Sequence, residues 1–236
     1  MVEKRILIVG MGGLGVPAAW ALARAKAGVL VILDPDPVEL SNLPRQVIYR
    51  ESDIGSSKVD AAVRRLRAAF PAIEIENHPV ALDSSNADSF VDAGDIVIDA
   101  TDDPRTKFLI NDTCISNHKP FVYGGVLGMT GQAMTVLPGK TACLRCLFEN
   151  PPDDAEAASC RDAGIVGPVA GAIGEVQASE ALRFVGGAAP RLAGAMLSYD
   201  GTDPARVRVS PVSPRAGCRC GARKISKDAH SLEEGR

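Results

Sequence analysis

Apolar and polar positions along the first half of the chain predict strands separated by helices. Arg5–Val9 and Val29–Leu33 are short and almost entirely apolar, which is typical of parallel strands buried on both faces. Between them, Val16–Ala27 carries apolar residues at helical spacing. Similar patterns predict helices over Lys58–Phe70 and Pro104–Ser116, and strands over Ile73–Glu76, Asp95–Asp99 and Phe121–Gly124. This alternation favours a Rossmann-like α/β domain.

The pattern changes after Gly131. Gln132–Leu137 alternates like an antiparallel strand, and Met196–Tyr199 and Arg206–Val209 predict two closing strands. The helix expected over Pro168–Val185 is rich in small residues, which allow another helix to approach closely. The sequence therefore predicts a mostly parallel sheet with antiparallel C-terminal strands.

Two segments lack these patterns. Asn150–Ser159 is rich in Pro, Asp and Ala, which indicates a mobile connection. Residues 221–236 are polar, and we expect them to form a disordered tail. A single domain is therefore expected over residues 1–220, and a chain of this length buries enough surface to fold without disulfides.

Composition narrows the possible partners. The net charge is −3 and aromatic residues make up 4% of the chain, so we expect neither a general attraction to polyanions nor a surface for stacking on bases. Met1–Lys4 leads directly into the first strand, and no apolar run has the length of a membrane span. We therefore expect a cytoplasmic protein that does not act directly on nucleic acid or on a membrane. Because that compartment is reducing, we interpret the six cysteines as metal ligands or reactive thiols in preference to disulfides.

A glycine-rich turn joins the first strand to the first helix, where many α/β proteins bind a nucleotide phosphate. Its glycines are Gly10, Gly12, Gly13 and Gly15. Glycine lets the backbone approach a phosphate, and the helix N-terminus supplies N–H donors. Asp34 ends the next strand, 19 residues after Gly15, where a carboxylate can accept hydrogen bonds from ribose hydroxyls. The turn predicts an adenine nucleotide, and a glycine turn without a ligand is the alternative.

The residues that follow distinguish ATP from NAD. Cations and hydrogen-bond donors come next in the sequence, at Asn42, Arg45, Gln46 and Lys58. A triphosphate requires such groups, whereas a nicotinamide requires a neutral stacking surface. Asp102 follows the fourth strand at the same crevice, where a carboxylate can hold Mg²⁺. This favours ATP with Mg²⁺, and the alternative makes Arg45 and Lys58 surface charges and Asp102 a helix cap.

Taken together, these motifs resemble one known family. The glycine turn, the stretch Asp34-x-Asp36-x-Val-x-x-Ser-Asn42-Leu-x-Arg45-Gln46 and the pair Thr101-Asp102 are similar to the motifs of the ThiF/MoeB/HesA adenylyltransferases, which are relatives of ubiquitin-activating enzymes. The likeness continues through Gly131-Gln132, Cys143-Leu-Arg-Cys146 and the segment from Cys160 to Pro168. It covers nearly the whole chain, and the thirteen residues from Asp34 are very specific.

The resemblance implies an enzyme that uses ATP and Mg²⁺ to adenylate the C-terminal Gly-Gly carboxylate of a small ubiquitin-fold sulfur carrier, in preparation for thiocarboxylate formation. It implies that Asp34 binds ribose, with Asp36 beside it at the nucleotide, and that Asp102 holds Mg²⁺. The phosphates would be bound by Asn42, Arg45, Gln46 and Lys58. Charge that moves onto departing pyrophosphate would be stabilised by Arg45, Lys58 and Mg²⁺.

The resemblance also implies an organisation. An ATP-binding half would occupy about residues 1–130, and a carrier-binding and zinc part about residues 131–220 of one adenylation domain. A homodimer is expected. Because we recognise no rhodanese-like domain in the sequence, the sulfur donor is expected to be a separate protein.

Four of the cysteines resemble the two zinc half-sites of the family. Cys143 and Cys146 are separated by two residues, whereas Cys218 and Cys220 are separated only by Arg219. Four thiolates in a reducing compartment suit tetrahedral Zn²⁺, and a closed site of this kind is structural. The shorter second spacer departs from the family and would strain or weaken the site. The alternative is a set of unrelated surface thiols.

The other two cysteines differ from each other. Cys114 falls within an apolar helical pattern and is expected in the core. Cys160 follows the Pro/Asp/Ala-rich segment, and the charge of Arg161 would lower its thiol pKa. In the thiamine branch of the family the corresponding cysteine bonds covalently to the activated carrier, and in the molybdopterin branch it is dispensable. Cys160 is therefore a candidate for chemistry, with a solvated loop thiol as the alternative.

The chain also departs from the family. Members carry a segment before the first strand whose arginine reaches the ATP of the partner protomer, and here only Met1–Lys4 precede that strand. Asp103 and Lys107 stand where Asn and Arg are usual. The short N-terminus keeps open slow catalysis, an arginine from another protein, or a start further upstream. Two other functions remain: a non-catalytic scaffold that binds the carrier, and an NAD-dependent oxidoreductase.

Overall fold

The computed structural model describes residues 4–152, 164–203 and 205–221. One sheet contains all the strands of these segments, in the order β3-β2-β1-β4-β5-β6-β7-β8. Their bounds are β1 Arg5–Val9, β2 Val29–Leu33, β3 Ile75–His78, β4 Ile96–Asp99, β5 Phe121–Leu127, β6 Thr130–Val136, β7 Ala195–Asp200 and β8 Val207–Pro211. The strands β1 to β5 are parallel, and β6, β7 and β8 continue the sheet antiparallel. The predicted α/β fold is confirmed.

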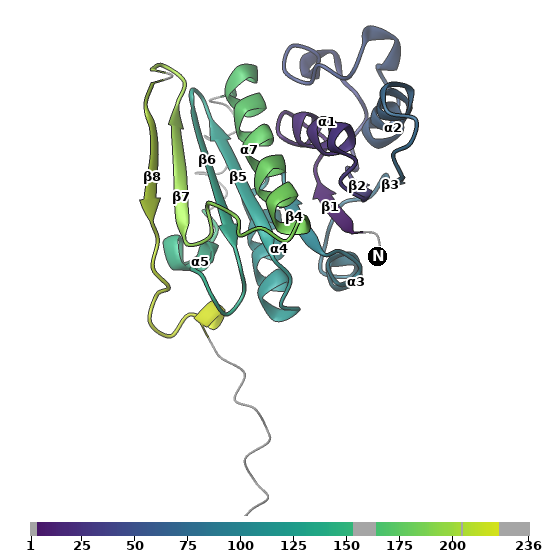
Figure 1. Ribbon diagram of the computed structural model, residues 1–236. Coiled ribbons are helices and arrows are strands. Elements are labelled where there is room, and N and C mark those ends of the chain that lie inside the picture. The colour runs from purple at the N-terminus through teal and green to yellow at the C-terminus, as the bar shows by residue number, and fades with distance from the viewer. Residues whose placement is uncertain (1–3, 153–163, 204, 222–236) are drawn as a thin grey trace, which may run out of the picture.

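Helices cover both faces of the sheet, which explains why the central parallel strands β1, β2 and β4 are almost entirely apolar. On one face lie α1 (Gly15–Ala25), α2 (Lys58–Ala69) and α7 (Gly167–Val185), packed on alternate strand residues such as Ile6 and Ile8. On the other lie α3 (Ala87–Ala93), α4 (Pro104–Ser116) and α5 (Leu144–Leu147), packed on Leu7 and Val9. Figure 1 shows α7 running across the sheet over β4, β5 and β6. In the part of the chain that the structure describes, short 3-10 helices occur at Leu40–Asn42, Glu51–Asp53 and Arg219–Gly221.

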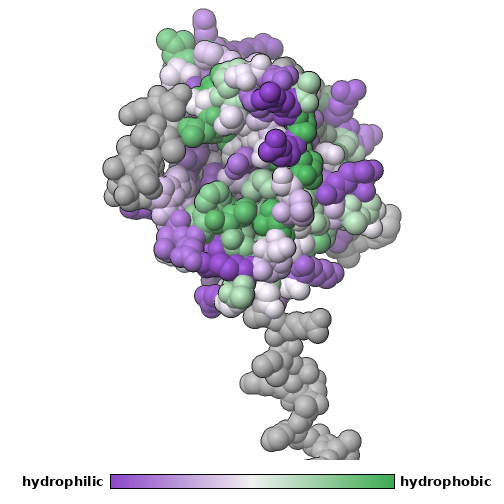
Figure 2. Space-filling view, turned by 90° about the vertical axis from the view of Figure 1, so that its left-hand side faces the viewer, coloured by the Kyte–Doolittle hydropathy of each residue, from purple (hydrophilic) through white to green (hydrophobic). Residues whose placement is uncertain are grey.

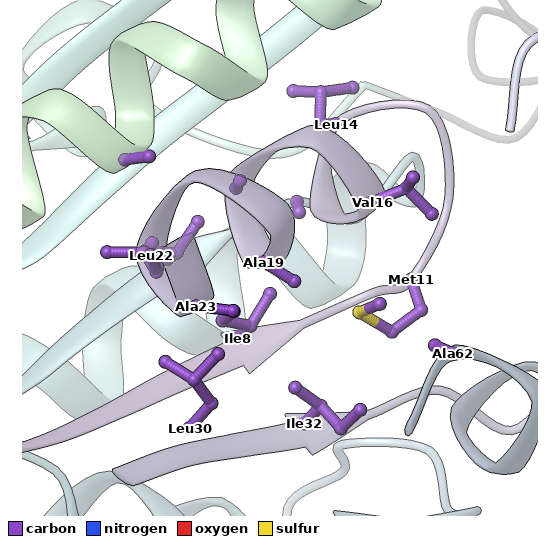
Figure 3. Packing of buried hydrophobic residues seen from close by; sticks show 14 of the residues in the cluster. Ile8, Met11, Leu14, Val16, Ala19, Leu22, Ala23, Leu30, Ile32 and Ala62 are labelled. Carbon is purple, nitrogen blue, oxygen red and sulfur yellow. The ribbon is translucent and has the colours of Figure 1, made fainter. Parts of the chain in front are cut away.

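Helix α1 packs on β1 and β2 and lies beside α7 on the same face of the sheet. Figure 3 shows Ile8, Leu30 and Ile32 of the strands facing α1. A Cβ atom added to Gly174 of α7 would lie 2.6 Å from Cγ of Pro17, so the two helices touch where α7 has no side chain. The small residues predicted in this helix therefore serve close packing, and they fix the start of α1 behind the glycine turn.

Several elements differ from the sequence-based expectation: α5 was not expected, β5 extends three residues beyond Gly124, and β3 and α3 differ as follows. The third strand was expected over Ile73–Glu76 but pairs with β2 from Ile75 to His78. Both Ile73 and Ile75 are buried, so the apolar alternation is real but does not show where the pairing begins. Helix α3 was not expected, because it has only 7 residues and buries only Ala87 and Val91.

The edge strand β8 forms one side of the molecule. Viewed from this side, hydrophobic residues gather in the middle among hydrophilic ones (Figure 2). Val207 and Val209 are 53% and 54% exposed there. Within the described segments, no helix combines the length and the apolarity needed to cross a bilayer. The tail expected over 221–236 lies outside the described residues from 222 on, as does most of the connection expected over Asn150–Ser159.

Candidate functional site

The order of the parallel strands reverses between β1 and β4. The chain runs outward from β1 through β2 to β3 and then returns to β4 on the other side of β1. In open α/β sheets, ligands bind at the carboxyl ends of the strands at such a reversal. The glycine turn follows β1 here, and Thr101 and Asp102 follow β4. The fold therefore brings both predicted motifs to one crevice.

Two glycines of the turn are required by its geometry. Gly10 has a φ of +97°, and a Cβ atom there would lie 2.6 Å from the carbonyl oxygen of Ala100. A Cβ atom on Gly15 would overlap the carbonyl oxygen of Gly10. The turn after β1 is therefore pressed against the end of β4, and it leads into the N-terminus of α1, where the helix dipole favours an anion.

Asp34 ties the glycine turn to the end of β2. Its Oδ2 accepts a hydrogen bond from the backbone N–H of Met11 at 2.7 Å, and its Oδ1 accepts one from Asp36 N–H at 2.9 Å. Burial raises the pKa of Asp34 above its ordinary value, although the charge of Lys58 acts in the opposite direction. The hydroxyl of Tyr49 donates to the Met11 carbonyl at 2.8 Å. The side chains of Asp34 and Tyr49 thus hold the backbone of the turn at Met11.

Lys58 brings a buried cation to the same place. Its Nζ lies 2.8 Å from Oδ2 of Asp36 and 3.8 Å from Oδ1 of Asp34. The side chain of Lys58 is 8% exposed, whereas that of Asp36 is 60% exposed. The backbone N–H of Lys58 also donates to the Asp36 carbonyl at 3.0 Å, which holds the first turn of α2 against this loop. The structure therefore brings Asp34, Asp36 and Lys58 together.

The loop between β2 and α2 places two more polar groups beside the turn. Gln46 is 3% exposed, and its Nε2 is 3.6 Å from the position of a Cβ atom on Gly12. Within the described part of the chain, Oε1 of Gln46 and Nε of Arg45 are buried without a hydrogen-bond partner. Asn42 is buried and accepts the Glu39 N–H at 3.3 Å, so it also holds the loop. Unpaired buried groups are costly, and a ligand oxygen would satisfy Nε of Arg45, whereas Oε1 of Gln46 requires a hydrogen-bond donor.

Two adjacent acids after β4 differ in what they bind. Asp103 caps α4 by accepting the Thr106 N–H at 2.8 Å, and bonds led by the Thr106 hydroxyl outweigh burial and lower the pKa of Asp103. Asp102 is exposed, and it makes no hydrogen bond or ion pair with the residues that the structure describes. The helix-cap alternative therefore applies to Asp103 and not to Asp102, whose carboxylate faces solvent at the crevice.

The sequence analysis missed a buried polar group beneath the crevice. Asp99 ends β4 with no exposure, and Nζ of Lys107 lies 3.1 Å from its Oδ1 and 2.6 Å from the carbonyl oxygen of Gly124. Gln177 of α7 donates to the Asp99 carbonyl at 2.6 Å. The sequence signal that could have identified it is an aspartate at the end of an otherwise apolar strand. Lys107 and Gln177 thus hold β4, β5 and α7 together below the crevice.

The cysteine cluster lies at the other end of the sheet. Sγ atoms of Cys143, Cys146, Cys218 and Cys220 all lie within 4.8 Å of one another. The pair Cys143–Cys218 is separated by 3.7 Å and the pair Cys146–Cys220 by 3.3 Å. Zn–S bonds of about 2.3 Å in a tetrahedron place sulfurs roughly 3.8 Å apart, so four thiolates at this spacing fit one zinc ion. Although only Arg219 separates Cys218 from Cys220, the sulfur atoms of both reach the cluster.

The thiols of the cluster differ in acidity. Burial raises the pKa of Cys143 to about 11. Burial also opposes ionisation of Cys146, but N–H donors led by Arg215, whose nitrogen is 3.3 Å from the sulfur, lower its pKa to about 7. Cys114 is a buried core residue, as expected. Cys160 and Arg161 lie outside the described residues.

The fold and the site define a class of protein: a Rossmann-like domain with a glycine-rich turn at the strand reversal and a cluster of four thiols at the opposite end. The model of the ThiF family matches residues 1–220. The chain therefore belongs to the ThiF family, as its motifs predicted.

Curated relatives agree with this assignment. The chain is 43% identical over 197 residues to "Adenylyltransferase and sulfurtransferase MOCS3" of Culex quinquefasciatus, covering 83% of this chain and 45% of the relative. It is 42% identical to "Adenylyltransferase and sulfurtransferase MOCS3-2" of Zea mays, covering 88% of this chain and 43% of the relative. The chain thus spans about half the length of the curated relatives it matches.

Solved structures share the fold at lower identity. Escherichia coli MccB, in a structure with succinimide, superposes with a TM-score of 0.82 at 21% identity, covering 93% of this chain and 66% of MccB. PaaA superposes with a TM-score of 0.74 at 22% identity, covering 89% of this chain and 73% of PaaA. At these identities the comparison speaks for the fold alone.

Proposed function

We propose that this chain is an ATP-dependent adenylyltransferase that activates the C-terminal Gly-Gly carboxylate of a ubiquitin-fold sulfur-carrier protein. The observation that carries the proposal is the set of groups at the crevice: the unpaired Nε of Arg45 beside the glycine turn, the cation of Lys58, and the exposed carboxylate of Asp102. The names of the curated relatives support it, since each is an adenylyltransferase and sulfurtransferase.

In this proposal the carrier carboxylate attacks the α-phosphorus of ATP, the P–O bond to pyrophosphate breaks, and an acyl-adenylate forms. The glycine turn and α1 hold the phosphates, and Asp34 and Asp36 hold the ribose end. Asn42 and Gln46 donate to phosphate oxygens, and Arg45 and Lys58 stabilise the charge that moves onto the leaving group. Asp102 would hold Mg²⁺, which neutralises phosphate charge when bound. The protein otherwise contributes orientation of the two reactants.

Lys58 is prepared for this role by its present contacts. The side chain of Lys58 is buried, and its ion pair with the exposed Asp36 keeps the ammonium group at the crevice. A triphosphate oxygen would replace part of that pairing without moving the helix. An NAD-dependent reaction would leave these cations without a use, so ATP and not NAD should bind in a direct titration.

Further proposals follow from the family resemblance. The finished enzyme would be a homodimer in a reducing, cytoplasmic setting, with Zn²⁺ on the four cysteines and a separate protein as sulfur donor. Cys160 would then receive the activated carrier. Its thiolate would attack the acyl carbon, a C–S bond would form, and AMP would leave with the electrons of the broken C–O bond.

The test is carrier-dependent exchange between ATP and pyrophosphate in the presence of Mg²⁺. Asp102→Asn should abolish exchange while leaving the melting temperature unchanged, since Asp102 is exposed and makes no bond with the described residues. Glu74→Gln is the matched control, because Glu74 is also an exposed acid but precedes β3 at the amino ends of the parallel strands. Normal exchange by Asp102→Asn, or equal losses in both variants, would reject the proposal for Asp102.

Arg45 should contribute less to the exchange rate than the metal ligand Asp102, but more than a residue that only binds ATP. Arg45→Ala should lower the exchange rate roughly 100-fold, because it removes stabilisation of charge in the transition state. Arg64→Ala is a suitable control, since that arginine is exposed and pairs with Asp53 at 3.1 Å. If Arg45→Ala raises KM for ATP and leaves kcat unchanged, Arg45 binds the ground state and the transition state equally and does not specifically stabilise the leaving group.

A further inference from the structure

The two halves of the cysteine cluster are attached to the protein in different ways. Cys143 and Cys146 flank Leu144 and Arg145, which lie directly against α4. Cys218 and Cys220 belong to the segment after β8, in which residues 213–217 are all exposed. A cluster assembled from two such unequal parts raises the question of which part depends on the metal.

Helix α4 holds the first half by hydrogen bonds from two neighbouring side chains. Asn111 is 1% exposed, and its Oδ1 accepts the backbone N–H of Leu144 at 2.9 Å. The carboxylate of Asp112 binds Arg145 with two bonds, 2.7 Å to Nε and 2.8 Å to Nη2. Nδ2 of Asn111 also donates to Asp112 at 2.9 Å, so the two acceptors are tied together. A bidentate guanidinium–carboxylate pair fixes orientation as well as distance.

Arg145 completes the attachment. Its guanidinium carbon lies 4.9 Å from the ring centroid of Phe108, one turn earlier on α4. Its Nη1 donates to the carbonyl of Glu149 at 2.6 Å, which closes the short segment after Cys146. The backbone N–H of Cys146 donates to the Cys143 carbonyl at 2.9 Å. None of these contacts uses a cysteine sulfur, so all of them are available without a metal.

The second half has few contacts of that kind. Its links to the rest of the described chain include the Gly139 N–H to Cys220 carbonyl bond at 2.9 Å and the ion pair between Arg215 and Glu149, whose side chains are 42% and 74% exposed. Exposed ion pairs contribute about 0–1 kcal/mol. Arg219 acts on Asp112 only through its charge, since no hydrogen bond joins the two among the described residues. The N–H of Val212 donates to the Gly194 carbonyl at 2.8 Å where the segment begins, and Cys220 is buried near its end, so between these two points the sulfurs are the main attachment.

We propose that Asn111 and Asp112 of α4 position Cys143 and Cys146 in advance, and that a metal bound there serves to capture the segment carrying Cys218 and Cys220. The proposal concerns the cysteine end of the sheet, goes beyond adenylation, and does not depend on it. It assigns to Asp112 a positioning role, exerted through Arg145, which carries the cysteine pair. It follows that metal loss should release one half of the cluster and leave the other in place.

Hydrogen exchange of the full-length, Zn²⁺-loaded protein tests the proposal, with and without a chelator and under reducing conditions. In the wild type, chelation should speed exchange at least roughly tenfold in peptides covering 212–221 and leave those covering 143–148 protected. In Asp112→Asn, chelation should release both peptides. Glu149→Gln is the matched control, because it removes an acid that pairs with Arg215 in the second half, and its 143–148 peptide should stay protected.

Each other outcome overturns the proposal. Equal release of both peptides in the wild type would show that the metal holds the first half as well. No change on chelation in either peptide would show that no metal captures the segment. Continued protection of 143–148 in chelated Asp112→Asn would remove the positioning role of Asp112. None of these readouts uses ATP or the carrier, so adenylation and this proposal fail separately.

Discussion

The two ends of the sheet are built on different principles. The crevice at the carboxyl ends of β1 and β4 is fixed by the backbone: Gly10 lies against Ala100, and Asp34 accepts N–H groups from Met11 and from Asp36. The cysteine end begins where β6 ends, opposite the start of β5, since Val136 pairs with Phe121. There the positions depend on side chains of α4 and on sulfurs.

Chain connectivity explains much of this difference. The groups at the crevice lie on loops that directly follow adjacent parallel strands, so the sheet brings them together at little additional entropic cost. Cys143 and Cys218 are 75 residues apart in sequence, and closing such a loop costs entropy that sulfur–metal bonds are suited to offset. The crevice should therefore survive loss of the metal, and it should fail only when its backbone is disturbed.

The largest effect should follow a change in that backbone. Gly15→Ala adds a Cβ atom onto the Gly10 carbonyl oxygen, and we expect it to lower the free energy of unfolding by roughly 3 kcal/mol and to abolish ATP binding. Urea denaturation and ATP titration measure both effects. Gly171→Ala on α7 is the control, because no atom lies within 4 Å of the new Cβ, and helix propensity predicts about 1 kcal/mol of stabilisation. Equal effects at the two glycines would refute the backbone account.

An intermediate effect should follow metal removal. Protein prepared under reducing conditions should contain about one Zn²⁺ per chain, bound by the four cysteines. A chelator should lower the melting temperature by roughly 5 °C or more. The affinity of the metal-free protein for ATP should stay the same, because the crevice lies at the other end of the sheet. A metal content of zero would remove the zinc assignment, and a parallel loss of ATP affinity would show that the ends are coupled.

The same contrast explains what could be predicted from the sequence. Buried parallel strands such as Val29–Leu33 and the glycine turn have local patterns, so the fold and the place of the crevice were accessible. The Cys-x-x-Cys and Cys-x-Cys pairs were also visible as local motifs, but only the family resemblance predicted that the two pairs come together. The bond of Gln177 to Asp99 spans 78 residues, and the choice of Lys107 as the partner of Asp99 depends on how α4 packs. Such contacts have no periodic signal.

The two adjacent aspartates show the same limit on a smaller scale. Both Asp102 and Asp103 precede Pro104, and either could cap the helix that begins there. The backbone geometry selects Asp103, whose φ of −90° and ψ of 118° are extended, and leaves Asp102 exposed. The sequence predicted the acid at the crevice but not the division of roles between the two neighbours.

The smallest effect on adenylation should come from Cys160, which lies outside the described residues. Cys160→Ser should leave carrier-dependent pyrophosphate exchange within roughly twofold of the wild type, because attack of a carboxylate on phosphorus needs no protein nucleophile. The same variant should lose the covalent adduct between enzyme and carrier, since the hydroxyl of serine is a far weaker nucleophile than a thiolate. Intact masses after incubation of both proteins with ATP and a sulfur donor show the adduct directly.

Cys114→Ser provides no useful comparison, because Cys114 is fully buried, so the control for Cys160→Ser is the wild type treated with hydroxylamine, which cleaves a thioester. If the variant and the wild type form carrier thiocarboxylate equally fast, Cys160 takes no part in sulfur transfer. If exchange itself collapses in the variant, Cys160 supports the structure of the crevice. Adenylation would then depend on the segment that carries Cys160 as well as on the groups at the carboxyl ends of β1 and β4, and a description of the molecule by its two ends alone would be incomplete.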